Sequence, residues 1–296
     1  MKRRGTVDLL FMLPCLLAFS MVILVPFGMG IYYALSDWNG VRTEINFVGF
    51  QNFAAMFTEP QFLYSFLITL LYTVINVVFV NLVGFALALM VTSQLKLRNF
   101  YRAGFFVPNL IGGLVLGYIW QFMFNNVLVM TGRSLGIAAL SSSLLASKDT
   151  VIWAMSFVNT WQYAGYIMMI YVAAIQAIPN SLMEAANVDG AGFFRRVRSV
   201  LIPMVANAFT ITIFLTLTTS FKQYDLNFAL TNGGPAMRFM GSAIKSSQLL
   251  AMDIFSTANS RNLLAEAQAK AVVFFVVLVV FSLIQVTINK RREVEA

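Results

Sequence analysis

Long apolar runs separated by polar stretches dominate the 296-residue chain. A helix needs about 20 predominantly apolar residues to cross a bilayer. Six runs come near or exceed that length: residues 9–35, 62–93, 103–125, 151–178, 203–221 and 271–289. None of them contains Asp, Glu, Lys or Arg. The pattern predicts an all-α membrane protein with six transmembrane helices, organised as a single transmembrane domain over residues 1–296.

The first run follows Lys2, Arg3 and Arg4, an arrangement that also begins a secretory signal peptide. However, the run is long, contains Pro14 and Pro26, and has no clear small-residue cleavage site. We therefore expect it to be retained as the first span.

The third run contains several residues that disturb helices: Pro108, Gly112, Gly113 and Gly117. Proline removes a backbone hydrogen bond, and glycine lets neighbouring helices approach closely. This run is therefore predicted to form a kinked, closely packed span.

Lys and Arg gather at four places along the chain, and their positions predict its orientation. The four triplets are Lys2, Arg3, Arg4; Lys96, Arg98, Arg102; Arg195, Arg196, Arg198; and Lys290, Arg291, Arg292. Cytoplasmic connections carry an excess of such residues. Both termini and the loop 179–202 are therefore predicted to be cytoplasmic, and residues 222–270 to lie largely outside the cell.

Composition excludes several classes of protein. Hydrophobic residues make up 59% of the chain and charged residues 11%, which is unlike a soluble domain. The net charge of +8 comes from clusters beside apolar runs, without the interleaved aromatic residues of a nucleic-acid surface. With Cys15 as the single cysteine and no histidine, neither a metal site nor a catalytic site is predicted.

The apolar runs also bear on how transport would be driven. Proton-coupled carriers place Asp, Glu or His within the membrane, and these runs have none. Sodium coupling through backbone carbonyls is weakened but stays open. The chain has no GxxxxGK[ST] phosphate-binding loop. Uphill transport would therefore take its energy from a partner.

The loop 179–202 has the pattern of a helix, a turn and a second helix. Pro179 ends the fourth run, Ser181 and Glu184 have the spacing of a capping box, and Gly190 permits a left-handed exit. Gly192 then allows a second short helix with three arginines, and Pro203 opens the next span. Alternatively, Glu184 only caps its helix and the arginines only anchor to lipid head groups.

Glu184-Ala185-Ala186, then Gly190, then Val200-Leu201-Ile202-Pro203 resembles the signature loop of the membrane subunits of binding-protein-dependent ABC importers. That family ends the loop with Ile-x-Leu-Pro, from which this chain departs conservatively. Three further segments resemble the maltose and multiple-sugar permease branch: Trp161 through Pro179, Asp189 to Gly192 and Thr231 to Pro235.

The resemblance implies the type I ABC importer transmembrane fold and a loop that docks on a cytoplasmic ATPase subunit. The residues implied in docking are Glu184, Ala185, Ala186, Asp189, Gly190, Gly192, Arg195 and Arg196. Implied partners are a second permease subunit, two ATPase subunits, an extracytoplasmic sugar-binding protein and membrane lipid, but no nucleic acid. ATP and Mg would be bound by the ATPase subunits, so no cofactor is expected in this chain.

Two polar helical faces are the candidate solute site. Asn159, Gln162, Tyr163 and Tyr166 share one face of the fourth run. On the fifth, Thr216, Ser220 and Gln223 have the same i, i+4, i+7 spacing. Their amide, hydroxyl and aromatic groups suit a neutral sugar. Alternatively, they only hydrogen-bond between helices. Asn76 and Asn81 share no obvious face with them and are expected to serve packing.

Together these features predict a multi-pass permease of a bacterial cytoplasmic membrane. It would form half of the translocation pathway for an oligosaccharide or related neutral sugar, and it would not itself be an enzyme. Residues 225–261 are expected to contact the binding protein. The two alternatives are a sodium-coupled secondary carrier and a non-transport membrane scaffold.

Overall fold

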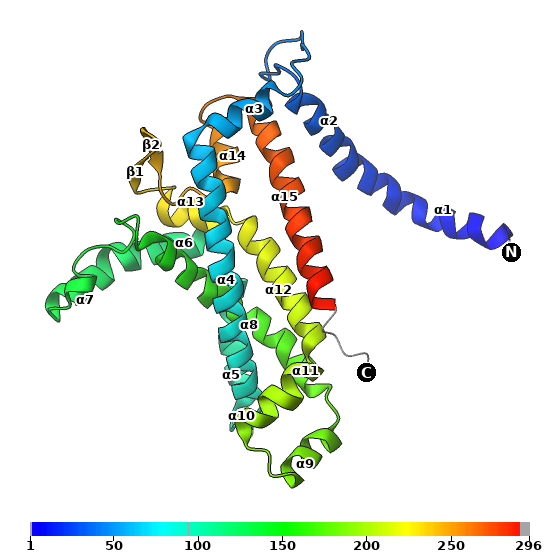
Figure 1. Ribbon diagram of the computed structural model, residues 1–296, viewed down its shortest axis with the longest axis vertical. Helices are drawn as coiled ribbons and strands as arrows, with labels where there is room; N and C mark the ends of the chain where they lie inside the picture. Colours follow the sequence, from blue (N-terminus) through cyan, green and yellow to red (C-terminus); the bar gives the residue numbers. More distant parts are fainter. Residues whose placement is uncertain (1, 94, 291–296) are drawn as a thin grey trace. The chain divides into compact units, whose positions relative to one another are not determined.

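The computed structural model describes residues 2–93 and 95–290, with side chains for 11–93 and 95–289 (Figure 1). It divides into two compact units: Met1–Glu59 with Ile254–Val276, and Pro60–Asp253 with Val277–Ala296. Four helical segments of the described residues are long and apolar enough to cross a membrane: Phe11–Ala34, Pro60–Thr92, Gly113–Ser134 and Leu264–Asn289. Two bent helix pairs raise the number to six, in agreement with the six apolar runs.

The first unit begins with a long helical segment made of α1 (Lys2–Phe19), a π-helical turn η1 (Ser20–Leu24) and α2 (Val25–Ala34). Its apolar side chains are almost all exposed, including Phe11 at 81% and Met21 at 72%. An apolar helix with so many exposed side chains is suited to lipid or to another membrane subunit.

A short loop structure follows α2 in the same unit. The Asn52 amide donates hydrogen bonds to the carbonyl oxygens of Ala34 and Ser36, each 2.8 Å long, and thereby joins α3 (Gln51–Thr58) to the end of α2. The carboxylate of Asp37 accepts from the side chain and the backbone N–H of Asn46. These two bonds lower the pKa of Asp37, because they stabilise its charged form.

A buried charge lies near the start of the last helix, α15 (Leu264–Lys290). Lys270 is fully buried, 2.7 Å from a Glu59 carboxylate oxygen and 2.8 Å from the Thr257 hydroxyl. Arg261 pairs with the same carboxylate. The sixth span was predicted to begin at residue 271, and this boundary is wrong, because paired charges let the helix begin at Leu264.

The second unit is built around α4 (Pro60–Thr92), α8 (Val151–Gln176) and α12 (Ala206–Phe221), which pack on one another (Figure 1). These helices carry no charged residue. Their contacts form two apolar clusters, one around Tyr72 and Met155 and one around Val80 and Tyr171. The burial of apolar side chains between these helices stabilises the unit.

The third run is broken rather than kinked. It contains α5 (Arg98–Phe106) and a 3-10 turn η2 (Val107–Leu110), followed by extended backbone at Ile111 and Gly112. A new helical segment then runs through α6 (Gly113–Phe122), the π turn η3 (Met123–Val127) and α7 (Leu128–Ser134). The predicted span 103–125 is therefore wrong, and Gly113–Ser134 is the candidate span.

Close helix contacts explain the glycines in and near the broken run. A Cβ on Gly117 would overlap Ala229 of α13 (Asp225–Thr231), and a Cβ on Gly165 of α8 would overlap the Phe105 carbonyl oxygen. Only glycine permits this approach of one backbone to another. The prediction of close packing is thus confirmed, although the helix itself is interrupted.

The segment after α12 contains structure that was not predicted from the sequence. A two-stranded antiparallel hairpin, β1 (Ala236–Phe239) and β2 (Ser242–Lys245), turns through Met240 and Gly241, both with positive φ. Gln61 anchors it to the start of α4, because its side chain exchanges two hydrogen bonds with the backbone of Lys245. Helix α14 (Leu250–Asn259) follows, and a 3-10 turn η4 (Ala138–Leu140) lies in an earlier connection.

Candidate functional site

A polar layer separates the two apolar clusters of the second unit. Along α4, the first cluster ends at Ile75 and the second begins at Val80; along α8, the first ends at Val158 and the second begins at Ile167. Asn76, Asn159 and Gln162 lie in these intervals and Asn81 directly follows Val80, and all four are at most 6% exposed. Asn76 is at the midpoint of α4, so the layer lies near the middle of a spanning helix. This is the depth at which transporters place solute sites.

One hydrogen-bond network in this layer joins three segments of the chain. The Gln223 amide donates to Asn159 Oδ1 (3.1 Å), and Asn159 Nδ2 donates to Asn76 Oδ1 (2.7 Å). Asn76 Nδ2 in turn donates to the Tyr72 carbonyl oxygen (2.7 Å). The expectation that Asn76 stands apart from the candidate face is therefore wrong, because α4 and α8 pack so that the two asparagines meet.

A second network lies on the side of the other apolar cluster. The Tyr171 hydroxyl donates to Asn81 Oδ1 (2.9 Å) and accepts from Thr212 Oγ1 (2.7 Å). Asn81 Nδ2 donates to Thr216 Oγ1 (3.3 Å). Thr216 and Asn81 thus link α4 to α12, which is the interhelical role that the sequence left open as an alternative for such residues.

The remaining predicted solute residues are not gathered at one point. Gln162 Nε2 donates to the Ile111 carbonyl oxygen (3.0 Å) at the break of the third run. Gln162 Oε1 and Ser220 Oγ are buried without a hydrogen-bond partner among the described residues. Tyr163 is half-buried, while Tyr166 is exposed and lines a separate groove. Buried polar atoms left without protein partners need water or a bound molecule.

The loop after α8 begins with a sharp change of direction. Helix α9 (Asn180–Val188) is bent by 76° from α8, with Pro179 at its N-cap. The predicted capping box is wrong, since Ser181 lies inside the helix and no side chain caps its start. Proline at the N-cap has no side-chain oxygen that could accept a hydrogen bond from the first turn, so the helix starts without a side-chain cap.

The exit from α9 is a Schellman motif. Gly190 has φ +72°, Ala191 N donates to the Ala186 carbonyl oxygen (2.9 Å), and Gly190 N donates to that of Asn187 (3.0 Å). The predicted left-handed exit is confirmed. Gly192, by contrast, has φ −66° and ψ 168°, an extended conformation open to other residues.

A second helical segment follows, as predicted, and carries the three arginines. It contains α10 (Phe193–Arg196), the π turn η5 (Val197–Leu201) and α11 (Ile202–Met204), and is bent by 75° from α12. Pro203 was predicted to open the next span, but it lies inside this segment and the bend follows at Val205. Arg196 donates a hydrogen bond to the Asn187 side chain, which ties this segment to α9.

The two faces of α9 differ in exposure. Glu184 and Ala185 are exposed, and Glu184 forms no ion pair with any described residue. Ala186 is only 8% exposed, so most of its side chain packs against its own chain, and its role in docking stays a prediction. Large apolar side chains are exposed beside this surface, Val188 at 88% and Phe194 at 85%. Exposed apolar side chains of this kind mark a surface for contact with another protein or with the membrane.

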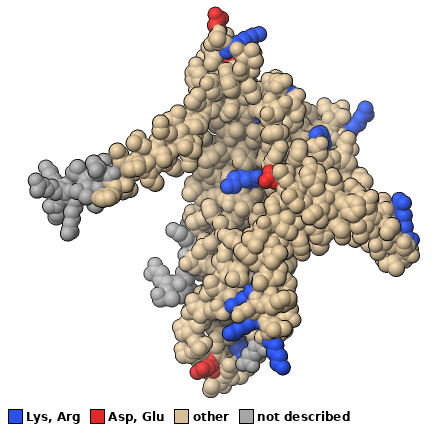
Figure 2. Space-filling view, turned by 180° about the vertical axis from the view of Figure 1, so that it is seen from behind, with Lys and Arg blue, Asp and Glu red and all other residues tan. Residues whose placement is uncertain are grey.

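Basic residues gather at the same end of the second unit as this loop (Figure 2). The connection between α4 and α5 supplies Lys96, α5 supplies Arg98 and Arg102, and the loop supplies Arg195, Arg196 and Arg198. A cavity of about 700 Å³ is lined both by Ser93, directly after α4, and by Arg196, so the chain around the start of that connection lies near the loop. Two triplets that are far apart in the sequence therefore form one basic end.

Comparison with known families identifies the kind of protein. A family described as "binding-protein-dependent transport system inner membrane component" matches residues 81–294, which is well over half of the chain. This chain belongs to that family. The family match includes Asn159, Thr216 and the whole loop 179–202, whereas Asn76 of the polar layer lies before the matched region.

Individual relatives agree with this assignment. The probable starch degradation products transport system permease protein AmyD of Thermoanaerobacterium thermosulfurigenes is 40% identical over 286 residues, 97% of this permease and 94% of the relative. The multiple sugar-binding transport system permease protein MsmF of Streptococcus mutans is 28% identical over 269 residues, 91% and 90% of the two chains.

A solved structure confirms the predicted fold. It is a bacterial alginate ABC transporter in complex with an alginate pentasaccharide-bound periplasmic protein, similar to this permease with a TM-score of 0.78 at 18% identity. The similarity covers 98% of this chain and 96% of the other. This permease therefore has the membrane-subunit fold of an ABC importer.

Proposed function

We propose that this permease forms half of the translocation pathway of an ATP-driven importer for an oligosaccharide or a related neutral sugar. The single observation that carries the proposal is the 40% identity, over almost the whole chain, to a permease named for starch degradation products. The chemistry agrees, because α4, α8 and α12 present amides and hydroxyls at the polar layer but no charge. A charged solute would need a counter-ion that these helices lack.

Family membership weighs against both alternatives that the sequence left open. The family is described by its dependence on a binding protein, which the intramembrane solute and ion sites of a sodium-coupled carrier do not require, and a scaffold does not belong to a transport system. Two cytoplasmic ATPase subunits would supply the energy by binding ATP and Mg and hydrolysing ATP, and this chain would need no cofactor of its own. A second permease subunit of similar plan would complete the pathway.

Docking on the ATPase would use the surface around Glu184. The exposed carboxylate has no ion-pair partner among the described residues, so an arginine of the partner could form a charge-assisted pair with it. The basic end would then face the cytoplasm, as would both termini. Closure of the ATPase dimer would move α9 and the helices attached to it, which would reorient the solute site.

The solute site would lie in the polar layer. Asn159 and Gln223 already meet there, and Ser220 Oγ and Gln162 Oε1 are buried with hydrogen-bonding capacity to spare. During transport a sugar hydroxyl would replace some of the interhelical bonds. Residues 225–261, including the β1–β2 hairpin, would receive the sugar-binding protein on the outer side.

Reconstitution with the cognate ATPases, binding protein and second permease would test this function. Uptake of labelled maltooligosaccharides into proteoliposomes should require ATP and the binding protein. A Gln223→Ala variant should assemble normally but need more sugar-loaded binding protein for half-maximal uptake. ATP-independent uptake, or uptake restricted to charged solutes, would contradict the proposal.

A further inference from the structure

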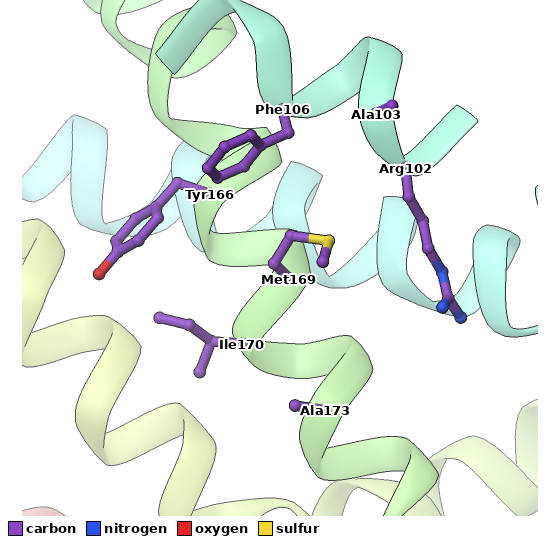
Figure 3. Close-up of a pocket in the computed structure, with 7 residues that line it drawn as sticks. All are labelled: Arg102, Ala103, Phe106, Tyr166, Met169, Ile170 and Ala173. Carbon is purple, nitrogen blue, oxygen red and sulfur yellow. The ribbon is translucent and has the colours of Figure 1, made fainter. Parts of the chain in front are cut away.

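A groove of about 620 Å³ lies between α5 and α8 (Figure 3). Helix α5 supplies Arg102, Ala103 and Phe106, and α8 supplies Tyr166, Met169, Ile170 and Ala173. Its lining includes no member of the two hydrogen-bond networks of the polar layer. Apart from Arg102 and the Tyr166 hydroxyl, the lining is apolar, so water would not fill this groove favourably.

Arg102 has unused hydrogen-bonding capacity at one end of the groove. One guanidinium nitrogen, Nη2, donates to the Val91 carbonyl oxygen at a long 3.4 Å. Its Nε is buried and has no hydrogen-bond partner among the described residues. A guanidinium has five N–H donors in a fork that matches a phosphate or carboxylate. The side chain is therefore poised to receive an anion.

The groove runs from the basic end of the second unit into the apolar part of the helices. Helix α5 leads away from that end, from Arg98 to Phe106, and α8 leads towards it, since α9 follows α8. Arg102 stands beside Val91 in the last turns of α4, whereas Phe106 and Tyr166 lie further along the groove (Figure 3). Charge at the membrane interface and apolar walls beyond it match an amphiphile with an anionic head.

We propose that this groove binds one anionic phospholipid of the cytoplasmic leaflet. Its phosphate accepts hydrogen bonds from Arg102, and one acyl chain lies against Phe106, Met169 and Ile170. The assignment of the leaflet rests on the proposed function, which places the basic end in the cytoplasm, where anionic lipids are attracted to basic residues. A free phosphate would satisfy Arg102 but would leave the apolar walls uncovered.

Native mass spectrometry of the assembled transport complex tests the proposal. The complex is purified in mild detergent with equal amounts of phosphatidylglycerol and phosphatidylcholine, and bound lipid is counted for each variant. Arg102→Gln should lower retained phosphatidylglycerol by about tenfold, because the charge-assisted bonds are lost. Arg98→Gln is the matched control, since Arg98 lies one turn earlier on α5, is exposed and does not line the groove.

Two further variants separate a lipid site from a structural role of Arg102. Ala173→Phe fills the groove without changing its charge and should displace the lipid while Arg102 stays in place. Arg102→Lys keeps the charge and should retain part of the binding. Retention in Arg102→Gln equal to that in Arg98→Gln, or unchanged retention in Ala173→Phe, would overturn the proposal.

The same preparation distinguishes other occupants and other failures. Displacement of bound phosphatidylglycerol by millimolar inorganic phosphate would show a simple anion site. Efficient crosslinking of Ala173→Cys to the second permease would show that a protein covers the groove. Either result would overturn the proposal that a lipid occupies the groove. If the unmodified complex showed no ATP-driven uptake but still retained lipid in a manner that depends on Arg102, the result would instead contradict the proposed function alone.

Discussion

The polar layer and the loop 179–202 differ in how their polar groups are satisfied. Asn76, Asn159 and Gln223 are bonded to one another inside the helix bundle. Glu184 is exposed and forms no ion pair with any described residue, on a helix that projects beyond α8. The first region can change only by exchanging internal bonds, while the second can gain a bond from outside. The polar layer therefore suits a solute site whose internal hydrogen bonds rearrange, and the loop suits a surface that another protein binds and pushes.

The largest effect is expected at the exposed carboxylate. Glu184→Lys should abolish sugar uptake while the protein stays inserted, since a lost charge-assisted bond of about 2 kcal/mol weakens docking roughly 30-fold. Like-charge repulsion against a partner arginine would add to the loss. Copurification of the ATPase with this variant, compared with Ser181→Ala, measures the effect. Undiminished copurification and uptake would remove Glu184 from the docking surface.

The next effect should come from opening the buried network. Asn76→Ala leaves Asn159 Nδ2 without its acceptor and should lower stability by about 1–3 kcal/mol. Replacing both Asn76 and Asn159 by Leu should restore much of that stability, yet uptake should stay lost. Thermal unfolding in detergent and proteoliposome uptake provide the two readouts. Normal uptake by the double variant would show that the layer only joins helices.

A smaller effect is expected at the turn after α9. Gly190→Ala places a Cβ at φ +72° and should cost about 1–2 kcal/mol locally, which would loosen the Schellman motif. Gly192→Ala is the matched control, because the backbone there is extended. The ratio of sugar imported to ATP hydrolysed should fall in the first variant and be retained in the second. Equal ratios would show that the exit geometry does not matter for coupling.

The smallest effect separates neighbouring arginines. Arg196→Ala removes the hydrogen bond to Asn187 that joins the two helices of the loop. Arg195→Ala removes an exposed charge that forms no side-chain hydrogen bond or ion pair with any described residue. A partly exposed bond of this kind is worth about 1 kcal/mol or less. Hydrogen exchange at α9 should increase modestly only in Arg196→Ala. A larger increase in Arg195→Ala would contradict the pairing.

Much of the fold could be predicted because lipid imposes a simple rule. Spans need apolar length, and the runs that became α4 and α8 were located to within a few residues. The loop was also predictable, since Gly190 and the proline at 179 act locally on the backbone. Four features depended on tertiary contacts instead: the break at Ile111, the helical start before Lys270, the β1–β2 hairpin and the meeting of Asn76 with Asn159.

Each of these misses has a physical reason. Gln162 of α8 donates a hydrogen bond to the Ile111 carbonyl oxygen at the break. The residues of the third run alone do not predict this contact. Lys270 is tolerated because Glu59, more than two hundred residues earlier in the sequence, pairs with it. The sequence does hold one indication of the contact at Asn76, because an asparagine in the middle of an apolar span needs a hydrogen-bond partner.

The most direct test of the account is the sidedness of the loop 179–202. With Cys15 replaced by serine, Ala185→Cys should react with a membrane-impermeant maleimide in inside-out vesicles and not in right-side-out vesicles. Addition of the ATPase subunits should protect it. Labelling from the outer side, or labelling that the ATPase leaves unchanged, would contradict the claim that another protein drives this permease through Glu184 and its helix.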